Sequence, residues 1–120
     1  MPRRFSPVIE NKHGCLWIVL PDSIDMDSCS AIEARLIPLL EEAGGRVAMD
    51  FSKTSAIYSS GLGLVLRMKA TIDESGGKLH LVNLSERLVE AFENVGLDQV
   101  LPVYRTENDL KTALESSSTD

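Results

Sequence analysis

The sequence predicts an α/β fold in which short buried strands alternate with helices around one core. Three apolar runs of four or five residues carry the strand signal: Leu16–Leu20, Val47–Phe51 and Leu79–Val82. Each interval between two of these runs holds a segment with helical periodicity that ends at a glycine pair, Gly44-Gly45 or Gly76-Gly77. A chain of 120 residues suits a single hydrophobic core. The expected element order is ββαβαβαβα.

The N-terminal part is expected to form a hairpin followed by a helix. Two apolar segments, which begin at Val8 and Leu16, flank a polar stretch that is typical of a hairpin turn. Ser28 or Ser30 can cap the next helix, and the second of these serines forms a capping-box pattern with Glu33.

The C-terminal half is expected to contain three more helices. The first covers about residues 60–74, with an inward apolar stripe made of Leu62, Val65, Leu66 and Ile72. Ser85 is the expected cap of the next helix, and Gly96 is its expected end. An edge strand at 100–104 should follow, and Thr106 should open the last helix.

The composition argues against several classes of function. Twelve basic and eighteen acidic residues give a formal charge of −6, so we expect no binding to nucleic acid or to an anionic membrane surface. No apolar run approaches the roughly 20 residues needed to span a bilayer, and no apolar segment near the N-terminus resembles a signal peptide. The two cysteines lack metal or redox spacing. We therefore expect a cytoplasmic protein without a cofactor, with a domain at 1–115 and a flexible polar tail at 116–120.

Two adjacent serines, Ser59 and Ser60, separate the apolar strand that ends near residue 51 from the helix that begins near Gly61. A hydroxyl at the start of a helix can be reached from solvent, so it can be modified and its modification can be detected by a partner. The alternative is that Ser60 is only a helix cap that accepts a hydrogen bond from the amide of Leu62 or Gly63.

The same segment resembles the signature of STAS domains, the anti-sigma factor antagonists of bacteria. In that family an apolar strand that ends in Asp or Asn leads through a short turn to Asp-Ser-Ser-Gly-Leu-Gly at a helix start. Asp50 matches the strand-end acid, and Ser59-Ser60-Gly61-Leu62-Gly63 matches the second half of the signature. The resemblance extends over roughly residues 8–115. It implies a mixed sheet with the helices largely on one face.

The resemblance also implies the site. The serine directly before the glycine is the phosphorylated one in the family, which corresponds to Ser60, with Ser59 as the second choice. Asp25 matches an acid that serves the switch serine in the family, although it can also help to cap the next helix. Tyr58 replaces the family's usual acid, and a phenol carries no charge at neutral pH. Phosphorylation of Ser60 is therefore expected to be slower, to use another kinase, or to be absent. Partner contacts are expected at Asp25, Tyr58, Ser59, Ser60, Gly61 and Leu62.

Two enzymatic or ligand-binding interpretations are weaker. Gly61 and Gly63 suggest a nucleotide loop, but Leu66 stands where a third glycine would be, and no lysine follows as in a phosphate-binding loop. A hydrolase would need glycine two residues before Ser60, where Tyr58 stands. We therefore expect no catalytic residue in this chain.

The expected function is that of a regulatory binding module. The resemblance implies that the unphosphorylated chain binds an anti-sigma factor serine kinase of the histidine-kinase-like ATPase type, which releases a sigma factor. The kinase then phosphorylates Ser60, and a phosphatase restores the hydroxyl. The alternative is a STAS subunit without a phosphorylation switch, of the kind associated with lipid or sulfate transporters, and Tyr58 favours this second function.

Overall fold

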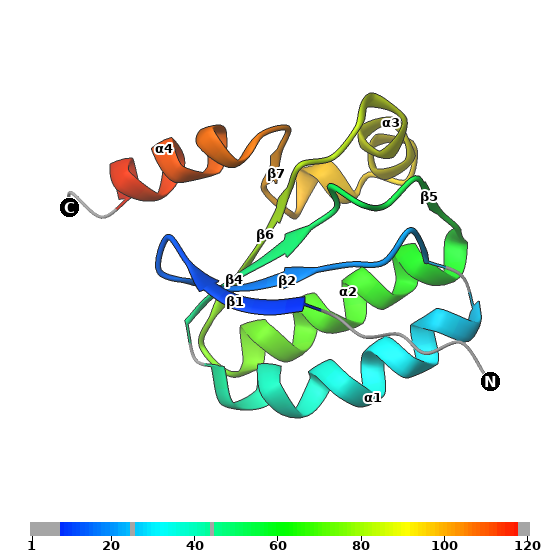
Figure 1. Cartoon of the computed structure of the whole chain (residues 1–120), viewed down its shortest axis with the longest axis horizontal. Coiled ribbons are helices and arrows are strands. Elements are labelled where there is room, and N and C mark those ends of the chain that lie inside the picture. The colour runs from blue at the N-terminus through cyan, green and yellow to red at the C-terminus, as the bar shows by residue number, and fades with distance from the viewer. Residues whose placement is uncertain (1–7, 25, 44, 118–120) are drawn as a thin grey trace.

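The computed structural model describes residues 8–24, 26–43 and 45–117, and its centre is a five-stranded mixed sheet (Figure 1). The strand order is β1-β2-β4-β6-β7; β1 and β2 are antiparallel, and every other neighbouring pair is parallel. The elements of this sheet and its helices are β1 (Val8–Lys12), β2 (Cys15–Val19), α1 (Met26–Ala43), β4 (Arg46–Asp50), α2 (Ser59–Glu74), β6 (Lys78–Val82), α3 (Glu86–Asn94), the short 3-10 helix η1 (Leu97–Gln99), β7 (Val103–Tyr104) and α4 (Glu107–Ser117).

Two further strands were not expected from the sequence. They are β3 (Ser23–Ile24) and β5 (Ala56–Ile57), which pair in parallel as a separate two-stranded sheet. Strands of two residues carry no detectable alternation of apolar and polar positions, so only the rest of the fold specifies them. The small sheet matters because β3 directly precedes α1 and β5 directly precedes α2.

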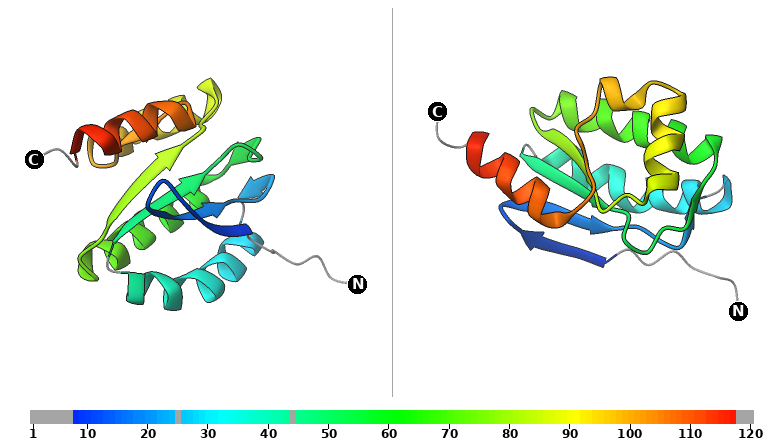
Figure 2. Two further views of the ribbon diagram at one scale, coloured as in Figure 1. Left: turned by 60° about the vertical axis from the view of Figure 1, so that its left-hand side comes forward. Right: turned by 90° about the horizontal axis from the view of Figure 1, so that it is seen from above.

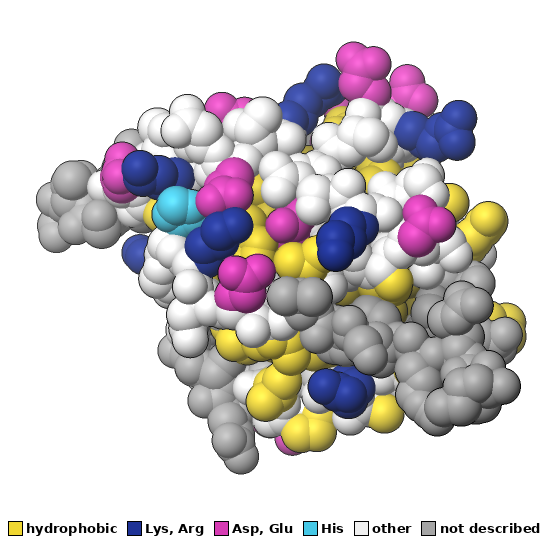
Figure 3. All heavy atoms as spheres, viewed as in Figure 1, with side chains coloured by type: hydrophobic (Ala, Val, Ile, Leu, Met, Phe, Trp, Pro, Cys, Tyr) yellow, Lys and Arg dark blue, Asp and Glu magenta, His cyan; other side chains and the backbone are white. Residues whose placement is uncertain are grey.

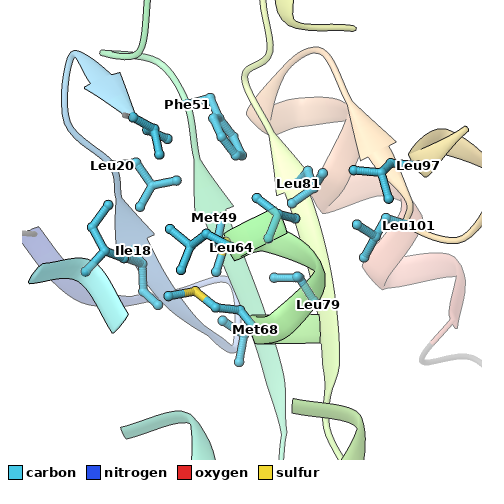
Figure 4. Close-up of a cluster of buried hydrophobic side chains, with 14 of the residues drawn as sticks. Ile18, Leu20, Met49, Phe51, Leu64, Met68, Leu79, Leu81, Leu97 and Leu101 are labelled. Atoms are coloured by element: carbon cyan, nitrogen blue, oxygen red, sulfur yellow. The ribbon is translucent and has the colours of Figure 1, made fainter. Parts of the chain in front are cut away.

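The two faces of the large sheet are covered unequally. Helices α1 and α2 lie on one face and α4 lies on the other (Figure 2). The buried residues of α1, α2 and α3 belong to one large cluster with β2, β4 and β6, in which Met49, Leu64 and Leu81 meet (Figure 4). The predicted fold, with the helices largely on one face of a mixed sheet, is confirmed.

A smaller cluster occupies the face beneath α4. Trp17, Ala48 and Val82 of the sheet pack there against Leu110 and Leu114 of α4. Successive side chains of a strand point to opposite faces, and so neighbouring residues of one strand serve the two different clusters.

Local signals predicted several element ends correctly. The hairpin turn consists of His13 and Gly14, both with positive φ. The Ser85 hydroxyl accepts a hydrogen bond from the amide of Leu88, and Gly96, just beyond α3, is left-handed with φ of 78°. The amide of Asp109 donates to the Thr106 hydroxyl at the start of α4. These caps involve only neighbours in the sequence, so the sequence alone was sufficient to predict them.

Two details of the helices differ from the expectation. Helix α1 begins at Met26, so Ser30 lies inside the helix and the predicted capping box with Glu33 is wrong. In α2 the buried residues are Gly61, Leu64, Val65, Met68 and Ile72. Leu66 lies off this stripe and is exposed, because one residue in a helix corresponds to a rotation of about 100°. The predicted strand at 100–104 is shorter and covers only β7.

Candidate functional site

The two serines lie in the first turn of α2, directly after β5. Ser59 is the first residue of the helix and Ser60 the second, and the capping position belongs to Tyr58, whose backbone is extended. The Tyr58 side chain makes no capping hydrogen bond, but its carbonyl accepts bonds from the amides of Gly61 and Leu62 at 2.8 and 3.0 Å. The expectation that Ser60 itself caps the helix is therefore wrong, and its hydroxyl is not committed to the amides of Leu62 or Gly63.

Both serine side chains can be reached from solvent. Ser59 is exposed and Ser60 is half-buried. Within the described part of the chain, no side-chain hydrogen bond from either hydroxyl is found. The amides of Ser59 and Ser60 also precede the first hydrogen bonds within the helix, as the first amides of any helix do. The positive end of the helix dipole and uncommitted amides therefore lie beside two free hydroxyls.

Gly61 fixes the position of this first turn. A Cβ atom at Gly61 would lie 2.6 Å from Cγ1 of Ile57, 2.8 Å from Cγ2 of Ile24 and 3.0 Å from the carbonyl oxygen of Ile24. The helix therefore contacts the backbone of the small β3–β5 sheet at this point. Any side chain here would push the first turn of α2, and Ser60 with it, away from the sheet.

The loops on either side of the site are held together by backbone and side-chain hydrogen bonds. The amide of Tyr58 donates to the carbonyl of Ile24 at 3.2 Å, which continues the pairing of β3 with β5. The Ser55 hydroxyl donates to a carboxylate oxygen of Asp22 at 2.7 Å, and the Thr54 hydroxyl donates to the carbonyl of Pro21 at 2.7 Å. As a result, the N-termini of α1 and α2 lie side by side.

Three exposed apolar side chains lie at the start of α1, at the start of α2 and in the second turn of α2. Met26, the first residue of α1, is 74 % exposed, Tyr58 is 55 % exposed, and Leu66 is 45 % exposed. Leu62 is half-buried and lies on the same face of α2 as Ser59 and Leu66, at helical spacing. We call this surface the serine face and define it as Met26, Tyr58, Ser59, Ser60, Leu62 and Leu66. Exposed apolar side chains that gather on one surface are typical of protein-binding sites.

The predicted contact residues Tyr58, Ser59, Ser60, Gly61 and Leu62 are consecutive and form one turn. Asp25 lies outside the described residues. Its two neighbours in the chain, Ile24 and Met26, are described and lie at the β3–α1 junction, beside the N-terminus of α2.

A bidentate ion pair connects α1 and α2 next to the serine face. Nε of Arg67 lies 2.6 Å from Oε2 of Glu33, and Nη2 lies 3.0 Å from Oε1. The hydrogen bond from Arg67 lowers the pKa of the Glu33 carboxyl below its ordinary value of 4.5. Both side chains are partly exposed, so the pair aligns the two helices but contributes little free energy.

Asp50, the strand-end acid of the motif, is held inside the fold by hydrogen bonds from three other residues. It is buried, and it accepts hydrogen bonds from the Trp17 indole at 2.9 Å, the Asn83 amide group at 3.0 Å and the Ser52 backbone amide at 2.8 Å. Burial raises the pKa of the carboxyl, but the hydrogen bonds outweigh it, and the pKa lies below its ordinary value of 3.8. The carboxylate at the end of β4 therefore connects the middle of β2 with the residue that follows β6. Sequence analysis missed Trp17 and Asn83 because both partners are distant in the chain.

The two histidines lie away from the serines. His13 is in the hairpin turn, with Nε2 2.7 Å from a carboxylate oxygen of Glu107, and His80 is buried within β6. Neither is positioned as a base for Ser60. Within residues 8–24, 26–43 and 45–117, no group of three or more His, Cys, Asp or Glu side chains could hold a metal ion.

Two observations concern membranes and surface charge. None of the helices in the described ranges has the length and apolar character of a membrane span. Acidic and basic side chains are interspersed over the face seen in Figure 3, so the net charge of −6 is not gathered there into one acidic patch.

A family model and a curated relative both match most of this chain. The family model described as the STAS domain matches residues 6–110. The anti-sigma-B factor antagonist of Bacillus subtilis (strain 168) is 27 % identical over 95 residues, which cover 79 % of this chain and 86 % of the relative.

Solved structures share the fold at low identity. The crystal structure of an anti-sigma factor antagonist from Mycobacterium paratuberculosis superposes with a TM-score of 0.80 at 21 % identity and covers 96 % of this chain and 97 % of its own. A sulfate transporter family protein from Wolinella succinogenes gives a TM-score of 0.68 at 15 % identity, with coverage of 83 % and 86 %. At such identities, these two likenesses concern the fold alone.

Proposed function

The chain belongs to the STAS domain family, and from this premise we propose that it is an anti-sigma factor antagonist whose partner binding is switched off by phosphorylation of Ser60. The protein acts as a binding partner and a kinase substrate, not as an enzyme. Its site of action is the cytoplasm, where sigma factors are controlled. The observation that carries this proposal is the position of Ser60, half-buried in the first turn of α2, next to the exposed Tyr58 and Ser59.

The position of Ser60 allows phosphorylation without unfolding. A phosphoserine carries about −1.5 to −2 charges and three acceptor oxygens at neutral pH. The first amides of α2 and the positive end of its dipole favour an anion at this place. The fold therefore tolerates the phosphate, and the change is confined to the surface.

The surroundings of Ser60 explain how a phosphate would end binding. The exposed apolar side chains of Met26, Tyr58 and Leu66 suit a partner that covers this surface. A phosphate under such a partner would lose its water and meet apolar groups without a compensating cation, which is costly. Because Gly61 fixes the first turn against β3 and β5, the serine cannot move aside easily.

The partner that fits this mechanism is an anti-sigma factor serine kinase of the histidine-kinase-like ATPase type. The Ser60 oxygen attacks the γ-phosphorus of ATP, the bond to the ADP oxygen breaks, and the hydroxyl proton leaves to a base of the kinase. A phosphatase restores the hydroxyl by adding water across the phosphate ester. Asp25, Tyr58, Ser59, Gly61 and Leu62 are proposed as the other contact positions, and Ser59 is the second choice as acceptor.

The test combines two serine variants with a kinase assay. We expect a histidine-kinase-like anti-sigma factor kinase from the same organism to transfer labelled phosphate from ATP to the wild type and to Ser59→Ala, but not to Ser60→Ala. All three proteins should bind the kinase before phosphorylation, and only Ser60→Ala should remain bound after ATP is added. Equal labelling of wild type and Ser60→Ala would contradict the assignment of Ser60.

A second candidate function is supported by Tyr58. In this alternative the chain is a subunit of a transporter-associated complex and Ser60 is not phosphorylated, in keeping with the absence of the usual acid at position 58. The fold is also compatible with it, because a sulfate transporter family protein contains a similar structure. Purification of the tagged chain from its own cells discriminates the two functions: a histidine-kinase-like ATPase supports the first, and a transporter component supports the second.

A further inference from the structure

His80 is the one described residue whose buried side-chain polar atoms all lack a hydrogen-bond partner. Its side chain is 5 % exposed, and neither Nδ1 nor Nε2 finds a partner among the described residues. It pairs in register with Ala48, and both residues face the side of the sheet that α4 covers. A neutral imidazole there already leaves one donor and one acceptor unsatisfied, which is uncommon in a protein interior.

The charges around His80 disfavour its protonation. Lys78 on the same strand and Arg46 on β4, which pairs with Lys78, both act on the ring. The ring of Tyr104 on β7 lies 6.1 Å away and is uncharged at neutral pH. Burial, followed by the two positive charges, lowers the pKa of His80 from 6.5 to about 4.

The covering element, α4, offers no compensating anion at this place. Its inward residues are Leu110 and Leu114, and its charged residues near this end, Lys111 and Glu115, are exposed. Neither Lys111 nor Glu115 is among the groups that shift the pKa of His80. Asp50, two residues beyond Ala48 on the same face of β4, is engaged by Trp17 and Asn83 and is not among the groups that shift the pKa of His80. An imidazolium ion at His80 would therefore be opposed by two cations and covered by an apolar helix face, and water could solvate it only if α4 moved away.

The attachment of α4 is small enough to be released on its own. The helix has eleven residues and contacts β6 and β7 through two buried leucines. An isolated helix of that length is marginal in water, so packing on the sheet is what keeps it docked. At its N-terminus, Glu107 makes ion pairs with Lys12 and His13 of the hairpin.

We propose that protonation of His80 releases α4 from the sheet, so that acid exposes the face beneath α4 while the rest of the fold persists. This device is independent of the serine switch, because the serine face belongs to α1 and α2 and lies on the other side of the sheet. The released form would have a solvated His80 and an open apolar surface made of Trp17, Ala48 and Val82.

The effect of pH on the docking of α4 follows from the different proton affinities of His80 in the docked and released states. His80 binds a proton more weakly when α4 is docked than when it is released, so docking is stabilised above pH 6.5 and loses stability as the pH falls toward 4. With these two values, acid can shift the release equilibrium by at most about 300-fold. The Glu107 tether does not explain such a change. The hydrogen bond from His13 and the contact with Lys12 lower the pKa of Glu107 below its ordinary value of 4.5, so more than half of its carboxylate is still charged at pH 4.5.

The single tryptophan provides the readout. Trp17 is fully buried in the cluster beneath α4. Its fluorescence quenching by acrylamide should rise several-fold between about pH 7.5 and about pH 4.5, a range that spans the ordinary histidine pKa of 6.5 and approaches the docked value of about 4. Its emission should shift to the red over the same range. Far-UV circular dichroism should keep most of its signal, because α1, α2 and α3 stay folded.

Variants of the two histidines show which residue causes the rise in quenching at low pH. His80→Leu and His80→Gln carry no titrating group, and we expect both to show flat quenching over the same range. His13→Asn removes the other histidine together with its ion pair to Glu107 and its ring contact with Trp17 at 5.8 Å, so its quenching should be higher than that of the wild type at every pH. The acid transition itself should remain in this variant. The proposal is overturned if wild-type quenching does not change, if His80→Gln retains the transition, or if the rise in quenching coincides with a loss of circular dichroism in one global unfolding. If His80→Leu fails to fold, His80→Gln alone decides the question.

Discussion

The position that a Cβ atom on Gly61 would occupy lies 2.6 Å from Cγ1 of Ile57 and 3.0 Å from the carbonyl oxygen of Ile24, so α2 packs directly against the small β3–β5 sheet. The glycine that directly follows Ser60 is thus required by packing between two elements. It ties the orientation of Ser60 to the position of both helix N-termini.

Gly61→Ala is expected to destabilise the protein by about 1 to 3 kcal/mol, the usual cost of overpacking. Gly63→Ala is the matched control two residues later, where the nearest atom to a new Cβ is 3.4 Å away on the flexible Arg67 side chain. That substitution should be neutral or stabilising by up to about 1 kcal/mol, because alanine favours a helix over glycine. Urea unfolding followed by Trp17 fluorescence measures both. Equal stabilities of the two variants would show that the close approach at Gly61 has no energetic consequence.

A second prediction concerns Asp50, whose carboxylate accepts hydrogen bonds from Trp17, Asn83 and Ser52. In Asp50→Asn the new amide group faces donors, so at least one buried donor loses its partner, at a cost of about 1 to 3 kcal/mol near neutral pH. The free energy of unfolding in urea is the measurement. Asp73→Asn, which removes only a surface ion pair with Lys69, should cost less than about 1 kcal/mol.

The cost of Asp50→Asn should also depend on pH in one direction. The pKa of Asp50 is lowered below 3.8 in the folded state, so its carboxylate contributes full stability above pH 3.8 and loses it as the pH falls through the folded value. The difference between wild type and Asp50→Asn should therefore be constant from neutral pH down to mildly acidic pH and should shrink only in stronger acid. A difference that shrinks already near neutral pH would mean that the carboxylate is not held in its charged form.

The parts of the fold that could be predicted from the sequence rest on neighbouring residues. Ser85 and Thr106 act on amides three residues ahead, and apolar runs identify β2, β4 and β6. The parts that could not be predicted rest on partners far apart in the chain. Strands β3 and β5 exist because each pairs with the other, and the role of Asp50 depends on Trp17 and Asn83.

The same distinction applies to the candidate site. The strand, turn, serine and glycine order placed Ser60 at the start of α2, but the alternative capping role of Ser60 was two positions out of register, because Tyr58 occupies the capping position. The apolar contribution of Met26 to the serine face could not be foreseen. It depends on the pairing of Ile24 with Ile57, which brings the two helix N-termini together.

Ser60→Asp is expected to weaken binding to the kinase with little change in stability. Ser60 lies in the first turn of α2, where an acidic side chain interacts favourably with the helix dipole, so the free energy of unfolding should stay within about 1 kcal/mol of the wild type. The lost affinity comes from a charge that the partner must desolvate. Isothermal titration of both proteins with the kinase is the measurement, with Ser60→Ala as the uncharged control. If Ser60→Asp and Ser60→Ala bind equally well, charge at this position does not control binding.

Tyr58→Asp is expected to stabilise the chain as well as to restore the residue that is usual in the family. Tyr58 occupies the capping position of α2 and makes no side-chain hydrogen bond to the helix, whereas Asp is among the best capping residues. We expect a gain of about 0.5 to 2 kcal/mol in urea unfolding. Tyr58→Ala is the control, since it removes the phenol without adding a cap and should give no such gain.

The same variant tests whether an acid beside the serines assists phosphorylation. A carboxylate at position 58 can accept a hydrogen bond from the Ser60 hydroxyl and hold it in one rotamer, which a phenol does less well. We expect incorporation of labelled phosphate to be faster by about tenfold, the effect of about 1.4 kcal/mol in the activation barrier. The time course is measured with Ser60→Ala as the blank.

The capping role competes with this effect, because a carboxylate that binds the amides of Ser60 or Gly61 is less available to the hydroxyl. A variant that is more stable but no faster would assign position 58 to the helix start alone. If, in addition, neither protein incorporates phosphate with any histidine-kinase-like kinase, the transporter-associated function becomes the better proposal.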